Sequence, residues 1–272
     1  MSPEYLSAFG LQEPPFSKDV KDGDLWLPPS KQTALEMILQ ALSERASVIL
    51  SGEPGVGKTC LLRATRHHLP QAGYRLTYCH NATLGRRDFY RQLCLALGLA
   101  PSATAAGVFY AVSTHVQDLK NERLHPVFLL DEAHLLHQDT LDHLHILLNY
   151  EWDSQPLLSL ILVGLPELSD RLALRRNRSL YSRLHHRLSI GPLLPEDTAE
   201  YVRMRLRRSG CDRELFATDA LALLHEATLG AMREIDRLAT CALREAARKK
   251  RRLVERDVMA LVLQAGARDK DG

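Results

Sequence analysis

The 272-residue chain is long enough for one large domain and a small one, and its 45% hydrophobic and 25% charged content is ordinary for a globular protein. A net charge of +2 excludes an overall polycation, so any basic surface must be local. No apolar run is long enough to cross a membrane and no secretion-signal pattern opens the chain, which predicts a cytoplasmic protein. The five scattered cysteines lack C-x-x-C spacing, as expected of thiols in a reducing compartment.

Residues 1–30 are rich in proline and aromatic side chains, for example Pro14-Pro15-Phe16. Each proline removes a backbone donor and restrains the residue before it, which excludes a long helix. We expect an irregular segment that packs on the following core through its aromatic side chains. Ser30 then begins a helix with apolar residues at helical spacing.

Residues 52–59 have the sequence G-E-P-G-V-G-K-T, which fits the phosphate-binding pattern G-x-x-x-x-G-K-[ST]. A short apolar strand, 46–51, precedes them and a helix, 58–68, follows, which is the context that the pattern requires. The glycines let backbone N–H groups turn inward around phosphates at the start of a helix. A chance glycine turn is the alternative, but every fixed position is filled. The stretch therefore predicts a nucleotide-binding protein.

Each residue of this loop has an expected role toward ATP. Lys58 is expected to reach the β- and γ-phosphates, and the hydroxyl of Thr59 to bind Mg²⁺. The other expected nucleotide contacts come from the loop and the start of its helix. They are Glu53, Pro54, Gly55, Val56, Gly57 and Cys60.

Strands and helices alternate after the loop, which predicts a parallel sheet with helices on both faces. The expected strands are residues 74–79, 126–130 and 157–163. From Pro195 onward the periodicity is helical only, so a small all-α domain follows.

We therefore divide the chain into four parts. They are an N-terminal segment (1–30), an α/β core (31–192), a helical lid domain (193–265) and a disordered tail (266–272).

The apolar run 126–130 ends in Asp131 and Glu132, at the carboxyl end of a strand, where ligands of open α/β sheets bind. Asp131 is expected to hold Mg²⁺ opposite Thr59, directly or through water. Glu132 is expected to orient and deprotonate the water that attacks the γ-phosphate. Many strands end in acids, but this one lies two strands downstream of a complete phosphate loop. The pair predicts ATP hydrolysis that is slow or dependent on assembly.

The order of these parts resembles the AAA+ ATPases. Residues 5–16 and 163–168 are similar to one subgroup, which contains ExeA-type ATPases and the transposon ATPases of the TniB, TnsC and phage Mu B type. The resemblance covers nearly the whole chain. It implies an α/β P-loop NTPase with a five-stranded parallel sheet of order 5-1-4-3-2, flanked by helices and followed by a small all-α lid.

The resemblance also implies arginines that act on the γ-phosphate. Arg233, in residues 230–233, is similar to the sensor 2 arginine. Arg187 first, and Arg183 second, are expected to be the arginine finger that enters a neighbouring subunit's site, although either could be a solvated surface arginine. At the sensor 1 position, relatives often carry glutamine where this chain has Leu165, which cannot orient a water.

Histidine pairs such as His134-x-x-His137 and His143-x-His145 suggest metal binding. No cysteine or acid completes a tetrahedral set at the expected spacing, so surface histidines are favoured. His134 follows the acid pair directly and is expected near the nucleotide.

The transposon relatives bind DNA through core loops that line the pore of a ring or helical filament. The matching loop here is 80–87, and basic residues before the Asp-Glu strand are expected to complete the groove. Such side chains suit phosphates of double-stranded DNA without reading bases. The expected DNA contacts are Thr83, Arg86, Arg87, Lys120 and Arg123.

The leading hypothesis is an oligomeric ATPase that loads on duplex DNA and regulates transposition. It would recruit a DDE-type transposase, with a target-selection protein as a further partner, and disassemble on hydrolysis. An ExeA-type secretion ATPase is the first alternative. Relatives of that kind are expected to add a membrane segment, and this chain ends after the lid, which favours the DNA role without a membrane. A nucleotide-switched signalling oligomer is the second alternative.

Overall fold

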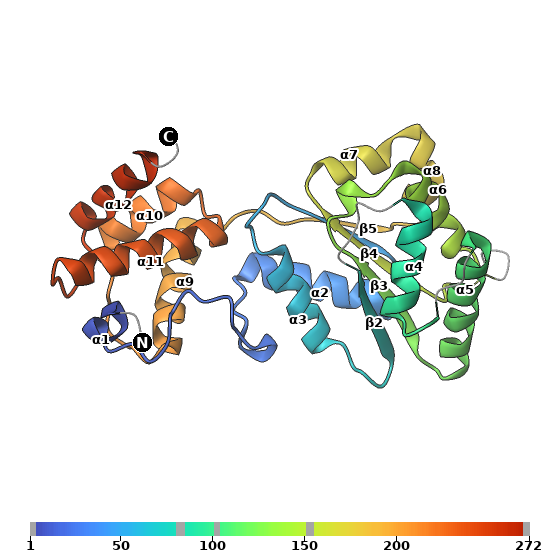
Figure 1. Ribbon diagram of the computed structural model, residues 1–272, viewed down its shortest axis with the longest axis horizontal. Helices are drawn as coiled ribbons and strands as arrows, with labels where there is room; N and C mark the ends of the chain where they lie inside the picture. The colour runs from blue at the N-terminus through green and yellow to red at the C-terminus, as the bar shows by residue number, and fades with distance from the viewer. Residues whose placement is uncertain (1–3, 80–84, 101–103, 151–154, 269–272) are drawn as a thin grey trace. The chain divides into compact units, whose positions relative to one another are not determined.

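The protein divides into an α/β unit and a helical unit, each described by itself below (Figure 1). The α/β unit comprises Pro29–Glu53 and Lys58–Ile190, and the helical unit comprises Pro54–Gly57 and the described residues at the two ends of the chain. The computed structural model describes residues 4–79, 85–100, 104–150 and 155–268.

A five-stranded parallel sheet forms the centre of the α/β unit. Its strands are β1 (Val48–Ser51), β2 (Tyr74–Cys79), β3 (His125–Leu130), β4 (Ser159–Gly164) and β5 (His186–Ser189). Their order, β2-β3-β4-β1-β5, confirms the predicted one. All residues of the three inner strands β3, β4 and β1 are buried, as expected where helices cover both faces of a sheet.

Two sets of helices cover this sheet (Figure 1). The first set shares one hydrophobic core with Phe128 of β3 and Leu160 of β4. Its members are α4 (Arg86–Ala96), α5 (Ala105–Asn121), α6 (Gln138–Leu147), α7 (Glu167–Ala173) and α8 (Arg178–Tyr181), with the short turn η2 (Ala133–Leu135). A second short turn, η4 (Arg175–Asn177), joins α7 to α8. The second set is α2 (Pro29–Ser43) and α3 (Lys58–His68), which pack side by side.

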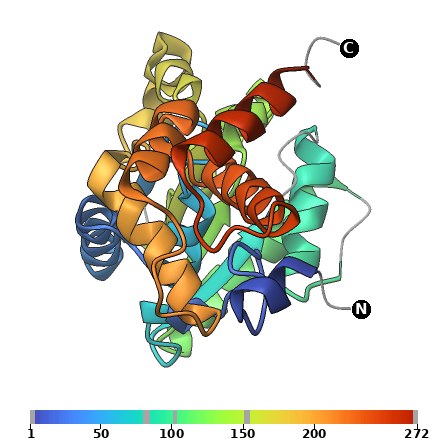
Figure 2. The ribbon, with the colours of Figure 1, turned by 90° about the vertical axis from the view of Figure 1, so that its left-hand side faces the viewer.

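Four helices make up most of the helical unit, drawn in orange to red in Figure 2. They are α9 (Pro195–Arg208), α10 (Thr218–Thr228), α11 (Met232–Arg248) and α12 (Arg256–Arg268). Helix α12 includes residues 266–268, which the sequence assigns to a disordered tail, so that part of the prediction is wrong. The helix continues because Val258, Met259 and Val262 anchor it on one buried face. Residues 269–272 lie outside the described part.

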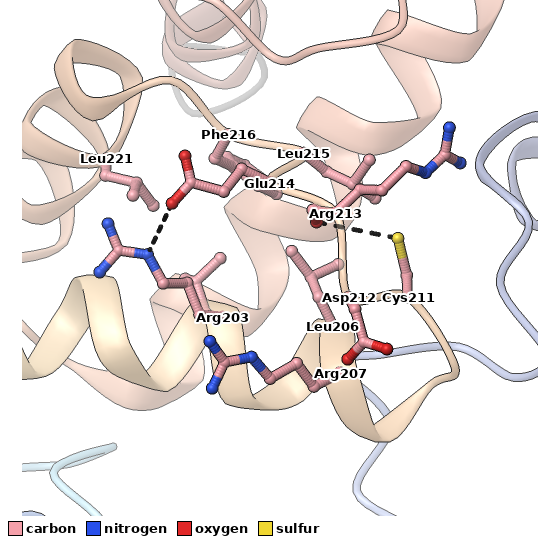
Figure 3. A pocket seen from close by; sticks show the side chains of 11 residues that line it. Arg203, Leu206, Arg207, Cys211, Asp212, Arg213, Glu214, Leu215, Phe216 and Leu221 are labelled. Atoms are coloured by element: carbon pink, nitrogen blue, oxygen red, sulfur yellow. Dashed lines mark hydrogen bonds and ion pairs between the residues drawn. The ribbon is translucent and has the colours of Figure 1, made fainter.

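A small cavity lies beside α9 in this unit (Figure 3). Arg203 and Glu214 face each other at its edge, with Arg203 Nε 3.4 Å from Glu214 Oε1. Its volume of about 30 Å³ has room for roughly one or two waters, so it cannot hold a nucleotide.

The N-terminal segment packs on the helical unit, and the prediction that it packs on the α/β core is wrong. It begins with a helix, α1 (Glu4–Phe9), which contacts α11, and continues through the turn η1 (Asp22–Asp24). The buried Arg205 of α9 donates hydrogen bonds from Nε to the carbonyl oxygen of Pro15, at 2.6 Å, and from Nη2 to that of Ser17. The proline-rich segment leaves these carbonyls without helical partners, and the arginine fork supplies two donors to them.

Replacing Arg205 by methionine is expected to lower the free energy of unfolding of the helical unit by about 2–4 kcal/mol, because two buried carbonyls lose charge-assisted donors. Urea unfolding followed by the fluorescence of Trp26, whose ring centroid lies 5.8 Å from that of Tyr201, measures the change. Arg203→Met on the same helix is the control. Its exposed ion pair with Glu214 contributes less than about 1 kcal/mol. Equal losses in the two variants would contradict the anchoring role of Arg205.

Candidate nucleotide-binding site

The glycine loop joins β1 to α3. Gly55 and Gly57 have φ angles of +81° and +100°, a region that glycine enters without steric cost. Lys58 Nζ donates hydrogen bonds to the carbonyl oxygens of Gly52, at 2.6 Å, and Glu53, at 3.1 Å. These bonds hold the lysine over the loop, where phosphate oxygens can take the place of the carbonyls. Thr59 is exposed in the first turn of α3.

The other expected nucleotide contacts differ in accessibility. Pro54 is exposed, Gly55 and Cys60 are half-buried, and the side chain of Val56 is buried. Val56 can therefore offer a nucleotide only its backbone.

Asp131 follows β3 at the same edge of the sheet as the loop after β1. Its Oδ1 accepts a hydrogen bond from the backbone N–H of Glu132 and its Oδ2 one from the hydroxyl of Tyr78, both at 2.9 Å. Burial, and then the charge of Asp131, raise the pKa of Tyr78, so the hydroxyl stays protonated and donating. The carboxylate is thus oriented from two sides.

Tyr78 is a site residue that the sequence analysis missed. It is the next-to-last residue of β2 and pairs in register with Leu129 of β3, two residues before Asp131. The signal was present in the predicted sheet order, because strands 2 and 3 are neighbours in it. Their last residues must therefore lie beside each other.

Glu132 has a left-handed backbone with φ of +52°. For a residue other than glycine this conformation costs roughly 1–2 kcal/mol, and such outliers concentrate at functional sites. Its carboxylate is half-exposed and its Oε2 lies 3.5 Å from Nδ1 of His134. A candidate base is therefore held at the surface beside a histidine.

His134 also contacts the end of β4. Its Nδ1 lies 3.4 Å from the backbone nitrogen of Leu165, and its carbonyl accepts a hydrogen bond from Arg171, at 2.8 Å. A Cβ on Gly164 would come within 3.1 Å of that Nδ1, so the glycine makes room for the ring. The structure thus brings a polar group, the ring of His134, to the end of β4 beside Leu165.

The donor set suits the ligands that the sequence analysis expects. Asp131 and Thr59 offer a carboxylate and a hydroxyl, the oxygen ligands that Mg²⁺ prefers. They follow β3 and β1, which flank β4, so the two strand ends lie roughly 10 Å apart. Phosphates held on the start of α3 would lie between these two groups.

The expected arginine fingers lie elsewhere. Arg187 is the second residue of β5 and pairs with Ile49, the second residue of β1. Its guanidinium stacks over the ring of Tyr181, 3.8 Å from the centroid. Arg183, just before β5, donates to the carbonyl of Ser179 at 2.9 Å. Both arginines therefore lie toward the amino ends of the strands, whereas the glycine loop follows the carboxyl end of β1.

Arg233 belongs to the helical unit, where it is exposed in the first turn of α11. It is not part of the α/β unit that carries Lys58, Thr59, Asp131 and Glu132.

The expected DNA contacts do not form one groove. Arg86 and Arg87 begin α4, after β2, whereas Lys120 and Arg123 precede β3. Since β2 and β3 are parallel and in register, the two pairs follow and precede opposite ends of these strands, which are roughly 17 Å long. The prediction of a single groove is therefore wrong. Thr83 lies outside the described residues.

Arg86 already has a partner in the core. Its Nη1 lies 2.6 Å from Nε2 of His143 on α6. Burial, followed by the charge of Arg86, lowers the pKa of His143, which keeps the imidazole neutral and able to accept. Arg87 is exposed at the same helix start.

Three solved structures have a similar fold. Cdc6p from Pyrobaculum aerophilum has a TM-score of 0.66 at 18% identity. The match covers 88% of this chain and 67% of Cdc6p. Aeropyrum pernix ORC1, solved in complex with DNA, also has a TM-score of 0.66 at 18% identity. The match covers 92% of this chain and 70% of ORC1. The Thermotoga maritima RuvB Holliday junction branch migration motor has a TM-score of 0.60 at 16% identity. That match covers 86% of this chain and 68% of RuvB.

Residues 39–172 match the AAA domain family. Together with the sheet order and the glycine loop, these likenesses show the fold of a P-loop NTPase, a five-stranded parallel sheet flanked by helices and followed by a helical region. The chain is also similar to General secretion pathway protein A of Aeromonas hydrophila. The two are 33% identical over 272 residues, which is 98% of this chain and 49% of the relative. The chain thus spans about half the length of the curated relative that it matches.

Changing Tyr78 to phenylalanine is expected to raise the Mg²⁺ concentration for half-maximal ATP hydrolysis roughly tenfold, because Asp131 loses the partner that orients it. A Mg²⁺ titration of steady-state turnover measures this. Tyr74→Phe on the same strand is the matched control, since its hydroxyl contacts the carbonyl of Leu42 at the other end of the sheet. An unchanged Mg²⁺ requirement in Tyr78→Phe would contradict the orienting role.

Proposed function

We propose that the protein is an oligomeric, ATP-hydrolysing DNA-binding protein that regulates DNA transposition. The observation that carries the proposal is a site divided between two edges of one sheet. Lys58, Thr59 and the Asp131-Glu132 pair share the carboxyl edge, whereas Arg183 and Arg187 lie toward the amino edge. A chain with this arrangement needs a neighbour's arginine to complete its site.

In this proposal Lys58 exchanges its two loop carbonyls for oxygens of the β- and γ-phosphates of ATP. Thr59 and Asp131 would hold Mg²⁺, which would neutralise charge that develops on the phosphates. Glu132 takes a proton from the attacking water, beside His134 at the end of β4.

The remaining roles belong to arginines. Arg187, or Arg183 in its place, enters the site of the next subunit and stabilises charge on the transferred phosphoryl group. Arg233 touches the γ-phosphate and couples the helical unit to the nucleotide state. Repetition of one such junction from subunit to subunit produces a ring or a helical filament.

Glu132→Gln is expected to lower turnover by roughly 10²–10⁴-fold, the usual contribution of a general base, while ATP binding is kept because the loop is intact. Turnover and binding of a fluorescent ATP analogue are measured separately. The exposed Glu122→Gln makes the same charge change on the loop before β3 and serves as control. Turnover within threefold of the parent would remove Glu132 from the role of base.

The DNA part of the proposal rests on the exposed start of α4 and is supported by the fold shared with ORC1, solved in complex with DNA. Arg86 contacts His143 of α6, so its substitution would also disturb that helix, and the exposed Arg87 is the one tested. Alanine at Arg87 is expected to weaken ATP-dependent duplex binding and to reduce the slope of log K against log salt by about 0.9, the value for one phosphate contact. Arg91→Ala, exposed on the same helix, should leave the slope unchanged. Equal slopes in parent and Arg87→Ala would contradict this contact.

The transposition role requires partners, a DDE-type transposase and a target-selection protein, which the ATP-bound assembly recruits to DNA in the cytoplasm. Electron microscopy of the protein with ATP, with and without duplex DNA, tests the proposal. Assemblies that form on DNA support it.

A secretion-associated ATPase is the second candidate, because the chain is 33% identical to General secretion pathway protein A over about half of that relative's length. In the part of the chain that the structure describes, no helix has the length and apolar character to cross a membrane. ATP-dependent assembly that is indifferent to DNA would shift the function to this candidate.

A further inference from the structure

A cavity of about 480 Å³ opens at the amino edge of the sheet, between the loops that precede β2 and β3. Its volume is that of a small-ligand site. Arg45, Lys120 and Arg123 supply three cationic side chains, and Tyr74, Leu124 and Leu157 supply an apolar wall. The glycine loop lies at the other edge, so this cavity is separate from the nucleotide site.

The two arginines occupy an unusual backbone position. Arg45 and Arg123 follow α2 and α5 with φ of +57° and +61°. Glycine is the usual residue at this left-handed position after a helix, and an arginine there is strained. This position brings two cationic side chains to one cavity from the ends of two helices.

Nothing in the described chain neutralises this pair. No described carboxylate forms an ion pair with Arg45 or Arg123, and the described residues that line the cavity include no acid. Lys120 Nζ donates a hydrogen bond to Gln155 Oε1 at 2.6 Å, and an ammonium group has three hydrogens to donate. Burial, and then the charge of Arg45, lower the pKa of His125 in the cavity wall to about 4, so this histidine is neutral at pH 7.

We propose that this cavity binds a phosphorylated small molecule of nucleotide size. Its phosphate is held by Arg45, Lys120 and Arg123, and its apolar or aromatic part lies against Tyr74 and the two leucines. A concave site with three cations and an apolar wall in its lining fits one terminal phosphate group on a compact ligand, whereas a DNA backbone presents phosphates in a row. Arg45 also lines an adjoining cavity of about 310 Å³ with Arg183, so occupancy acts beside an expected arginine finger.

The test uses the full chain with Lys58→Ala, which disables phosphate binding at the glycine loop, and sodium pyrophosphate as the probe. Thermal unfolding is followed at constant ionic strength, with sodium chloride as the reference salt. Pyrophosphate should raise the melting temperature in a saturable way. Adding Arg45→Gly and Arg123→Gly should raise the half-saturating concentration roughly tenfold or more, because two charge-assisted contacts are lost.

Substituting glycine for Arg45 and Arg123 distinguishes a role in ligand binding from a role in stability. Since glycine adopts both φ angles without strain, the Lys58→Ala variant with both glycines should melt, without pyrophosphate, no lower than Lys58→Ala alone. The matched control is Lys250→Gly in the same background. Lys250 is another exposed cation at positive φ, +55°, but it lies in the helical unit. It should keep the pyrophosphate response.

Two results would overturn the proposal. One is a pyrophosphate response that persists in the double glycine variant or disappears in the Lys250→Gly control. The other is stabilisation by a short DNA duplex, but not by pyrophosphate, that depends on Arg45 and Arg123, which would make this edge a DNA surface.

Discussion

All five strands run in one direction, so every loop that follows a strand meets at one edge of the sheet and every loop that precedes a strand meets at the other. Ligand groups that must act together therefore have to come from the same kind of loop. The glycine loop and the Asp131-Glu132 pair meet this condition. Arg183 and Arg187 do not, and in the proposed mechanism this is why a second subunit is needed.

The carboxyl edge also shows how local strain supports the arrangement. Glu132 is held at positive φ directly after an inner strand, and Gly164 leaves space for His134 between Glu132 and the end of β4. Tyr78 orients the neighbouring carboxylate from the other side. Each of these contacts joins two adjacent strands, so the geometry of the candidate site depends on the register of the sheet.

Sequence reasoning predicted the strand order and the glycine loop because both depend on local patterns of residues and on a resemblance that extends along the chain. It missed Tyr78 and did not assign His134 to the end of β4, since those contacts depend on which strands are neighbours and on their register. The error over Lys120 and Arg123 has the same origin, because a loop before one strand cannot join a loop after its parallel neighbour. The N-terminal segment was placed wrongly because its anchor, Arg205, lies 190 residues from Pro15.

The most direct test of the shared site is to mix two inactive variants, Lys58→Ala and Arg187→Ala. The first lacks a working phosphate loop and the second lacks the arginine that serves its neighbour. If sites form between subunits, random mixing should restore roughly a quarter of the parent's ATP turnover, because one junction in four then combines an intact loop with an intact arginine. The same mixing should be carried out with Arg183→Ala, since either arginine can be the finger. Mixtures that stay as inactive as their components, for both arginines, would contradict a site completed by a neighbouring subunit.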